Sequence, residues 1–170
     1  MPATPEDLFA RLDALNIQTT THSHPPLYTV EDSKALRGSL PGGHCKNLFL
    51  KDKKGQAWLI VADEDRDIDL KRLRRQIGAG GTLSFGKPEL LEDLLGVKPG
   101  SVTPFALIND TGQEVRVILD KLMLDHDVLN YHPLTNDATT TIGSGDLLRF
   151  IEACGHEARV VDLTAAPPED

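Results

Sequence analysis

An amine and a carboxamide stand side by side in this sequence at the start of an apolar run, where a strand would hold both rigidly. Lys46 and Asn47 follow the pair Gly42-Gly43, and Leu48–Leu50 comes directly after them. Lysine offers three hydrogen-bond donors, and asparagine offers both donors and an acceptor. The pair therefore suits the binding of a phosphate or an ester, although polar residues are also common where ordinary strands begin.

Cys45 offers a second kind of chemistry, because the adjacent Lys46 would lower the pKa of its thiol. With His132 as the base, this thiol could act as a nucleophile. A free cysteine is more often a small buried apolar residue, and the apolar run that follows Cys45 favours that alternative.

Six histidines and two cysteines raise the possibility of a metal site. His22 and His24 could share one face of a strand, but the remaining histidines and cysteines are scattered. Zinc sites in proteins show short, paired ligand spacings, and this sequence has none of them. We therefore expect no metal and no cofactor.

Two polar loops are further candidates for a binding site. Gly100–Pro104 has the form Gly-x-x-x-Pro, in which glycine lets the backbone approach a ligand and loop N–H groups can face an oxyanion. His132–Asn136 is a second polar loop that follows an expected strand. Each pattern alone is weak, since loops are rich in glycine and proline.

Composition limits the classes of protein that fit. At 170 residues, the chain matches one domain with a sizeable core. The net charge of -8 argues against nonspecific binding of DNA or RNA, although it leaves room for a small basic site. No apolar run approaches the roughly 20 residues of a membrane span. The sequence shows no signal peptide and has only two cysteines, so we expect a cytoplasmic protein.

The pattern of apolar and turn residues predicts one α+β domain. Its sheet is expected to be mixed or antiparallel, rich in hairpins and covered by helices. Residues 164–170 are expected to form a disordered tail. The expected helices cover residues 5–15, 29–36, 71–77, 88–95 and 144–154, the last of them capped by Ser144. The expected strands cover residues 18–24, 46–51, 56–62, 82–85, 105–108, 114–119, 128–131, 139–142 and 158–163, and two pairs of them, 46–51 with 56–62 and 105–108 with 114–119, are expected hairpins.

In order along nearly the whole chain, these motifs resemble the freestanding prolyl-tRNA editing proteins of the YbaK/ProX superfamily. The loop His132–Asn136 is similar to the ProX branch, which removes alanine, rather than to the branch associated with cysteine. The segments that carry the resemblance are His24-Pro25-Pro26, Tyr28–Glu31, Lys46–Leu50, Gly100–Phe105, His132–Asn136, Ala138–Ile142 and the stretch from Phe150 to His156.

The resemblance implies a YbaK-like curled sheet over residues 1–163 and hydrolysis of the ester of alanine mischarged onto tRNA-Pro. The acceptor end of that tRNA would be the substrate, and prolyl-tRNA synthetase a possible partner. By the same resemblance, the catalytic residues are Lys46, Asn47 and His132. The substrate-binding residues are Gly100, Ser101, Val102, Thr103 and Pro104, with Phe49, Val102 and Ile142 as candidate walls of the pocket.

The resemblance leaves the general base open, because chemistry in this family is thought to rely on the ribose hydroxyl of the substrate. Two other functions stay open. One is hydrolysis of another mischarged tRNA, such as Cys-tRNA(Pro). The other is a module that binds tRNA or a synthetase without turnover.

Overall fold

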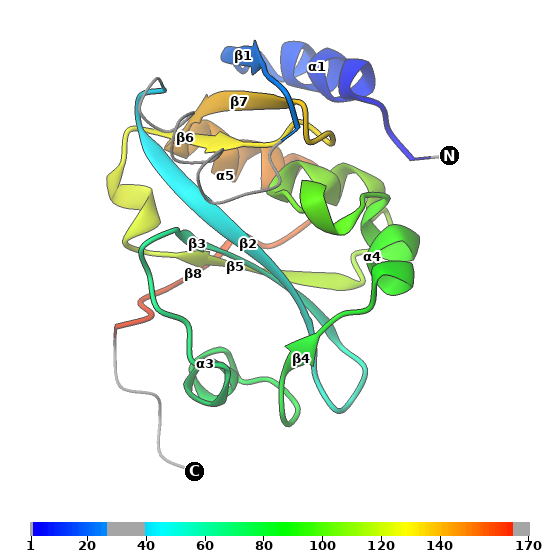
Figure 1. Ribbon diagram of the computed structural model, residues 1–170, viewed down its shortest axis with the longest axis vertical. Helices are drawn as coiled ribbons and strands as arrows, with labels where there is room; N and C mark the ends of the chain where they lie inside the picture. The colour runs from blue at the N-terminus through cyan, green and yellow to red at the C-terminus, as the bar shows by residue number, and fades with distance from the viewer. Residues whose placement is uncertain (1, 27–39, 165–170) are drawn as a thin grey trace.

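Strand β2 (Gly43–Lys51) is the structural centre of the molecule, as the apolar run after Lys46 indicates. The structure is a computed structural model that describes residues 2–26 and 40–164, and Figure 1 shows β2 running diagonally through it. β2 pairs antiparallel with β3 (Ala57–Asp63) across a tight turn, which confirms the first expected hairpin. At its first residues β2 also pairs in parallel with β6 (Val128–Tyr131).

The remaining strands extend this centre on both sides into one curled sheet. The order is β1-β7-β6-β2-β3-β5-β8, and the short β4 (Ser84–Phe85) pairs with the end of β2. Three pairs are parallel and the others antiparallel, so the expected α+β fold with a mixed sheet is confirmed. The strands not yet given are β1 (Thr19–Ser23), β5 (Val115–Asp120), β7 (Ala138–Gly143) and β8 (Arg159–Val161).

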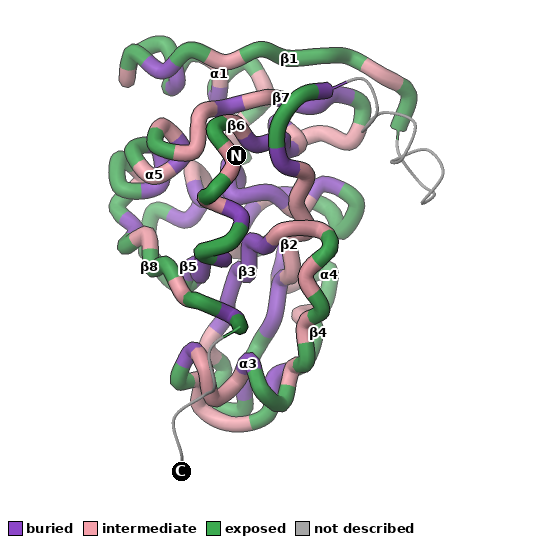
Figure 2. The backbone as a smooth tube through the Cα atoms, turned by 90° about the vertical axis from the view of Figure 1, so that its left-hand side faces the viewer, coloured by how far each residue is buried: buried purple, intermediate pink, exposed green. Residues whose placement is uncertain are grey.

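Helices cover both faces of this sheet, and each face has its own apolar cluster. Figure 2 shows that the central strand β3 is buried along nearly its whole length. On one face, α3 (Leu70–Ile77) packs Leu73 and Ile77 onto a cluster that contains Trp58 and Leu50. The larger cluster lies on the other face. It is closed by α1 (Pro5–Ala14), α4 (Pro88–Leu95), α5 (Ser144–Ala153) and the 3-10 helix η2 (Pro104–Asn109).

α1 begins with a capping box. Thr4 accepts a hydrogen bond from Asp7 N at 3.1 Å, and the Asp7 carboxylate accepts one from Thr4 N at 2.9 Å. The start of α5 is different from the expected one. Ser144 is the first helical residue rather than the cap, and Gly143 occupies the cap position without a side-chain hydrogen bond.

The second expected hairpin is wrong. Residues 105–108 lie in the 3-10 helix η2, and β5 pairs in parallel with β3. Pro104 opens η2, and the Thr103 hydroxyl accepts a hydrogen bond from Phe105 N, so the local capping is helical. A four-residue apolar run that is buried on every side has no periodicity that separates a strand from a helical turn.

Two expected elements lie wholly or largely outside the described residues: the helix at 29–36 and the tail at 164–170, of which only Thr164 is described. Two other expected strands are shorter than predicted, since β4 covers only Ser84–Phe85 and β8 only Arg159–Val161. Within residues 2–26 and 40–164, no helix is long and apolar enough to cross a membrane.

Candidate active site

β2 has a gap in its strand pairing where Lys46 and Asn47 lie. On the edge away from β3, β2 pairs with β6 only at Gly43 and His44 and with β4 only at Leu50 and Lys51. Among the described strands, none pairs with this edge between those two places. We call the edge of β2 from Cys45 to Phe49 the edge gap.

The backbone of Asn47 faces this gap. His44 O accepts a hydrogen bond from Glu64 on the β3 side, whereas Phe49 O accepts one from Gly86 on the opposite side. Because backbone groups alternate along a strand, Asn47 N–H and C=O share the direction of Phe49. A ligand at the edge gap can therefore hydrogen-bond to the backbone as an added strand would.

Lys46 and Asn47 extend from opposite faces of β2, because successive side chains on a strand alternate. Lys46 pairs with Ala62, a member of the apolar cluster under α3, and its side chain is half-buried. Asn47 shares the other face with Phe49, and its buried Oδ1 has no hydrogen-bond partner within the described part of the chain. The two side chains flank the edge gap from its two sides.

His132 directly follows the residue at which β6 ends, and its ring is fixed in one tautomer. Its Nδ1 lies 3.0 Å from Ala138 O. A carbonyl only accepts, so Nδ1 carries the hydrogen, and Nε2 has a free lone pair when the ring is neutral. Burial lowers the pKa of His132, and the nearby His24 lowers it further, while the bond to Ala138 raises it. The neutral ring with Nε2 as acceptor is therefore the form present at pH 7.

His132 and Lys46 lie on the same face of the sheet. His44 is in register with Asn130 across the parallel pair of β2 and β6. Lys46 is two residues beyond His44, and His132 is two residues beyond Asn130, so alternation directs all four side chains to one face. The structure thus places two of the expected catalytic residues on this face, and Asn47 on the other.

His24 joins this face, although the sequence did not single it out as a site residue. Its ring centroid lies 6.4 Å from that of His132. Its Nδ1 donates to Pro25 O at 2.8 Å, so its Nε2 accepts from the Thr139 hydroxyl, also at 2.8 Å. In the sequence, His24 belongs to the His-Pro-Pro segment that carries part of the family resemblance. The residue types of that segment did not by themselves indicate a role in the reaction.

The two polar loops lie against each other. A Cβ placed on Gly100 would be 3.5 Å from Asn136 Nδ2, so the Gly100–Pro104 loop meets the His132–Asn136 loop. Leu134 holds a left-handed backbone with φ 67°, which costs a leucine about 1–3 kcal/mol. Its side chain packs on the larger apolar cluster, which offsets this strain and fixes the loop beside His132.

Most of the remaining expected binding residues are buried. Gly100 is exposed and Val102 half-buried, whereas Ser101, Thr103 and Pro104 are buried. Phe49 and Ile142 are only 5% and 1% exposed and belong to the larger apolar cluster. The structure therefore places Ile142 in the core rather than on a pocket surface, because its strand β7 directs it inward beside Leu129.

Cys45 lies at the edge gap but has the wrong protonation state for a nucleophile. Burial raises the pKa of its thiol to about 12, against a hydrogen bond to Tyr131 that lowers it. The Cys45 Sγ donates to the Tyr131 hydroxyl at 3.5 Å, and that hydroxyl donates to Met123 Sδ at 3.1 Å. A thiol with this pKa is protonated at pH 7, which favours the buried apolar role.

In the part of the chain that the structure describes, no group of three or more His, Cys, Asp or Glu side chains is arranged to hold a metal ion. The histidines on the site face instead bond to backbone carbonyls and hydroxyls, as His24 and His132 do.

Comparison with known proteins identifies the family. The model of the aminoacyl-tRNA editing domain matches residues 24–150. The chain is 37% identical to the prolyl-tRNA editing protein ProX of Acetoanaerobium sticklandii, over 92% of this chain and 95% of that protein. It is 38% identical to the prolyl-tRNA synthetase associated domain-containing protein 1 of Mus musculus, again over 92% and 95%.

Solved structures share the fold. A crystal structure described as a candidate trans-editing enzyme for prolyl tRNA synthetase superimposes with a TM-score of 0.70 at 20% identity. That match covers 99% of this chain and 100% of the other. The chain thus belongs to the aminoacyl-tRNA editing domain family and, as a member, is a hydrolase of the aminoacyl-tRNA ester.

Proposed function

We propose that this protein hydrolyses the ester of alanine mischarged onto tRNA-Pro. The reaction takes place at the edge gap of β2, with Lys46 and His132 as the side chains that act on the ester. The observation that carries the proposal is the place of a lysine and a neutral histidine on one sheet face, beside a strand edge with which no described strand pairs. The relative named prolyl-tRNA editing protein supports the choice of tRNA.

The reaction is the addition of water to the ester carbonyl. The carbon–oxygen bond to the terminal ribose then breaks, and the products are free alanine and a ribose hydroxyl. The His132 Nε2 lone pair can accept the proton of the attacking water, or hold the ribose hydroxyl that accepts it. Either way, the proton returns to the ribose oxygen as it leaves.

The negative charge that develops on the carbonyl oxygen needs donors that are already in place. The Lys46 ammonium group supplies a positive charge on one side of the edge gap. The Asn47 backbone N–H supplies a donor at the strand edge itself. An aminoacyl ester is already activated, so positioning and charge stabilisation suffice for the rate.

Editing of alanine has a physical reason. A synthetic site shaped for proline rejects a smaller side chain poorly, because each missing methylene discriminates by only about 10–200-fold. A second site can exclude proline by size instead. Of the residues expected to form its walls, Val102 is the half-buried one that a ligand can reach from the surface.

Partners and location follow from the same proposal. The acceptor end of the tRNA is the substrate, and prolyl-tRNA synthetase, which releases the mischarged tRNA, is the proposed partner in the cytoplasm. The mouse relative carries the name of a synthetase-associated domain, which supports this partner.

The test is a deacylation assay with purified protein and tRNA charged with alanine, cysteine, serine or proline. We expect release of alanine and an intact prolyl ester. Equal rates on the alanyl and prolyl esters would contradict selection by size. Preference for the cysteinyl ester would assign the other substrate, and protection of the ester without release would assign a binding module.

A further inference from the structure

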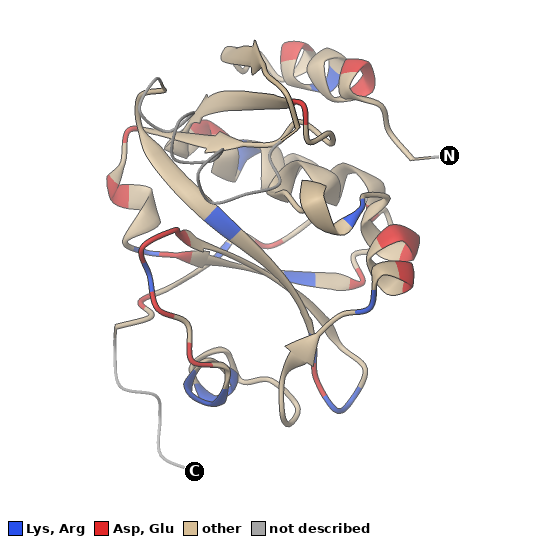
Figure 3. Cartoon of the chain, viewed as in Figure 1, with Lys and Arg blue, Asp and Glu red and all other residues tan. Residues whose placement is uncertain are grey.

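One end of this acidic protein carries a cluster of positively charged residues. Although the net charge is -8, α3 carries four basic residues in five positions (Figure 3). The turn between β2 and β3 carries two more. We call these six residues the basic surface: Lys53, Lys54, Lys71, Arg72, Arg74 and Arg75.

A buried carboxylate holds the two parts of the basic surface together. Asp52 is 4% exposed, and it accepts hydrogen bonds from Lys54 N and from the Trp58 indole N–H in its own hairpin. It also accepts one at 2.9 Å from Gly80 N, in the segment that follows α3. The negative charge of Asp52 is therefore internal, and its bonds fix the lysine turn beside the end of α3.

The contacts of the neighbouring glycines show how closely these parts meet. A Cβ on Gly80 would lie 2.6 Å from the Lys54 side chain, and one on Gly81 would lie 2.9 Å from that of Lys53. The stems of both lysines therefore run across the segment after α3, while both residues remain exposed.

The surface beside α3 is hollowed. A cavity of about 780 Å³ is lined by Lys71, Arg72, Arg74 and Arg75, together with Asp69, Leu70, Thr82 and Leu83. Arg74 Nε is buried and has no hydrogen-bond partner within the described part of the chain. Guanidinium groups in such a concave, positive surface match phosphate groups, which accept their hydrogen bonds in pairs.

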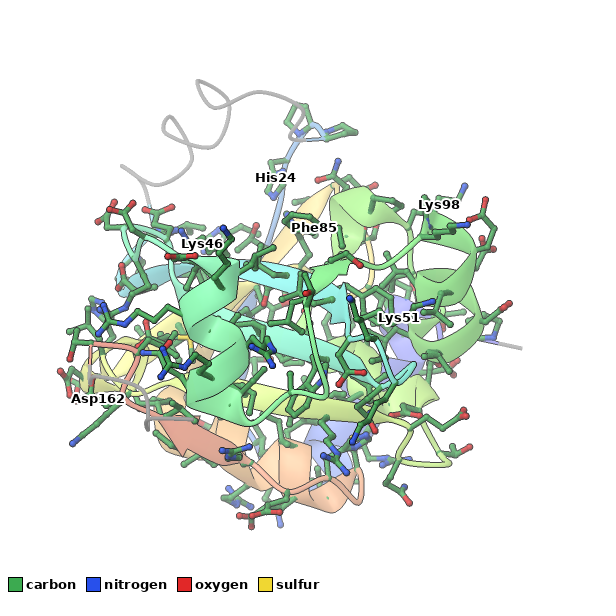
Figure 4. The ribbon with its side chains drawn as sticks, turned by 90° about the horizontal axis from the view of Figure 1, so that it is seen from below. His24, Lys46, Lys51, Phe85, Lys98 and Asp162 are labelled. Carbon is green, nitrogen blue, oxygen red and sulfur yellow. The ribbon has the colours of Figure 1, made fainter. Side chains whose placement is uncertain are left out.

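The basic surface and Lys46 lie on the same face of the sheet. Lys46 is paired with Ala62, and Ala62 belongs to the apolar cluster that α3 covers with Leu73 and Ile77. The view onto α3 in Figure 4 has Lys46 and Lys51 in sight from the same side. A polyanion bound on α3 can therefore continue along β2 to the edge gap without passing around the molecule.

Five acidic residues precede α3: Asp63, Glu64, Asp65, Asp67 and Asp69. Asp69 caps the helix by accepting from Lys71 N, and Asp63 lies 3.2 Å from the His126 ring. The negative charge of these carboxylates lies at the N-terminal end of α3, whereas the lysine turn meets the segment that follows the helix. The side left for a polyanion is that of the lysine turn.

We propose that the basic surface binds the phosphodiester backbone of the tRNA whose charged end reaches Lys46. This inference rests on the proposed function, which identifies the ligand as tRNA. The basic surface supplies the affinity for tRNA that the acidic remainder of the protein cannot supply. Binding through phosphates predicts a strong dependence on salt, with a slope of about 0.7–0.9 in log affinity per log salt for each contact.

Two double variants test the two halves of the surface: Lys71→Gln/Arg74→Gln in α3 and Lys53→Gln/Lys54→Gln in the turn. The matched control, Arg11→Gln/Lys121→Gln, removes two exposed charges from other parts of the chain. Each protein is measured in two ways: by steady-state deacylation of Ala-tRNA(Pro) at several salt concentrations, and by fluorescence anisotropy with uncharged tRNA-Pro.

We expect both test variants to raise KM and the Kd for uncharged tRNA about tenfold at low salt, with kcat within twofold and a flatter salt dependence. The control should stay within twofold of the wild type. Test variants that match the control would overturn the proposal, as would a wild type that does not bind uncharged tRNA. An effect seen only when prolyl-tRNA synthetase is present would assign the surface to a protein partner instead.

The binding measurement separates this proposal from the proposed function. If the wild type releases no amino acid from any charged tRNA, the proposed reaction is wrong. Loss of uncharged tRNA binding in the test variants would still assign the basic surface to RNA.

Discussion

In the proposed reaction, the protonation of one residue, His132, sets the dependence of the rate on pH. Its pKa is lowered below the ordinary value of 6.5 by burial and by His24. The neutral, active form therefore dominates at pH 7 and is lost as the pH falls through this lowered pKa. We expect kcat/KM to fall on the acid side with a midpoint below 6.5, and His132→Ala to remove that fall. A rate that does not change between about pH 5 and 8 would contradict a role for Nε2.

The surroundings of Cys45 keep its thiol protonated and therefore unreactive, although cysteine is a reactive type of residue. Its thiol pKa of about 12 leaves it protonated, and it packs at the rim of the larger apolar cluster. We expect Cys45→Ala to keep deacylation within about threefold and to lower the free energy of unfolding by about 1 kcal/mol, through the small cavity it leaves. Thermal unfolding and the deacylation assay measure the two effects. Loss of activity in a folded Cys45→Ala protein would show instead that the Cys45 thiol acts as a nucleophile.

At the scale of elements, the junction of β2 and β6 depends on close backbone approach. Gly42 has φ 89°, and a Cβ there would lie 2.5 Å from the Val128 backbone and side chain. Gly55 has a similar φ of 84° but nothing within 4 Å. We expect Gly55→Ala to cost about 1 kcal/mol from backbone strain alone. Gly42→Ala should cost about 1–3 kcal/mol more, because it also forces the strands apart.

Chemical denaturation of the two glycine variants measures this difference directly. Since the φ penalty is shared, the excess for Gly42→Ala reports the clash with Val128. Equal costs for the two variants would show that β2 and β6 can separate freely, and that the edge gap is not rigidly framed.

The elements that the sequence predicted are those with local signals. The start of α1 at Pro5 and the turn between β2 and β3 depend on residues within a few positions of each other, and both were found as expected. The run Phe105–Ile108 lacked such a signal, and its burial in η2 is decided by packing against other elements. The parallel pairing of β3 with β5 is likewise non-local.

In the candidate site too, the features with local signals were predicted from the sequence, and those that depend on distant segments were not. Residue types along β2 indicated Lys46 and Asn47, but no pattern in the sequence indicated that the pairing of β6 and of β4 with β2 would leave an edge gap between these two strands. That gap results from where two distant strands begin and end. The place of His24 beside His132 also depends on pairing between strands that are distant in the sequence, because β1 ends just before His24 and pairs with β7.

Across the whole molecule, the proposed reaction requires no metal. The described residues contain no group of three or more metal-ligating side chains, and the proposed charge stabilisation comes from Lys46 and a backbone N–H. We therefore expect a chelator such as EDTA to leave the deacylation rate unchanged, once any effect of magnesium on the tRNA itself is controlled. Loss of activity that added zinc restores would contradict this view.

In the proposed reaction Lys46 acts at the reacting ester, and the decisive measurement is the single-turnover rate of alanine release from Ala-tRNA(Pro). Lys46→Ala should lower this rate about a hundredfold, as the loss of one preorganised donor does, with little change in stability. The matched control is Lys51→Ala, which removes an exposed lysine from the end of the same strand and should leave the rate within twofold. A folded Lys46→Ala protein that releases alanine at the wild-type rate would contradict the account.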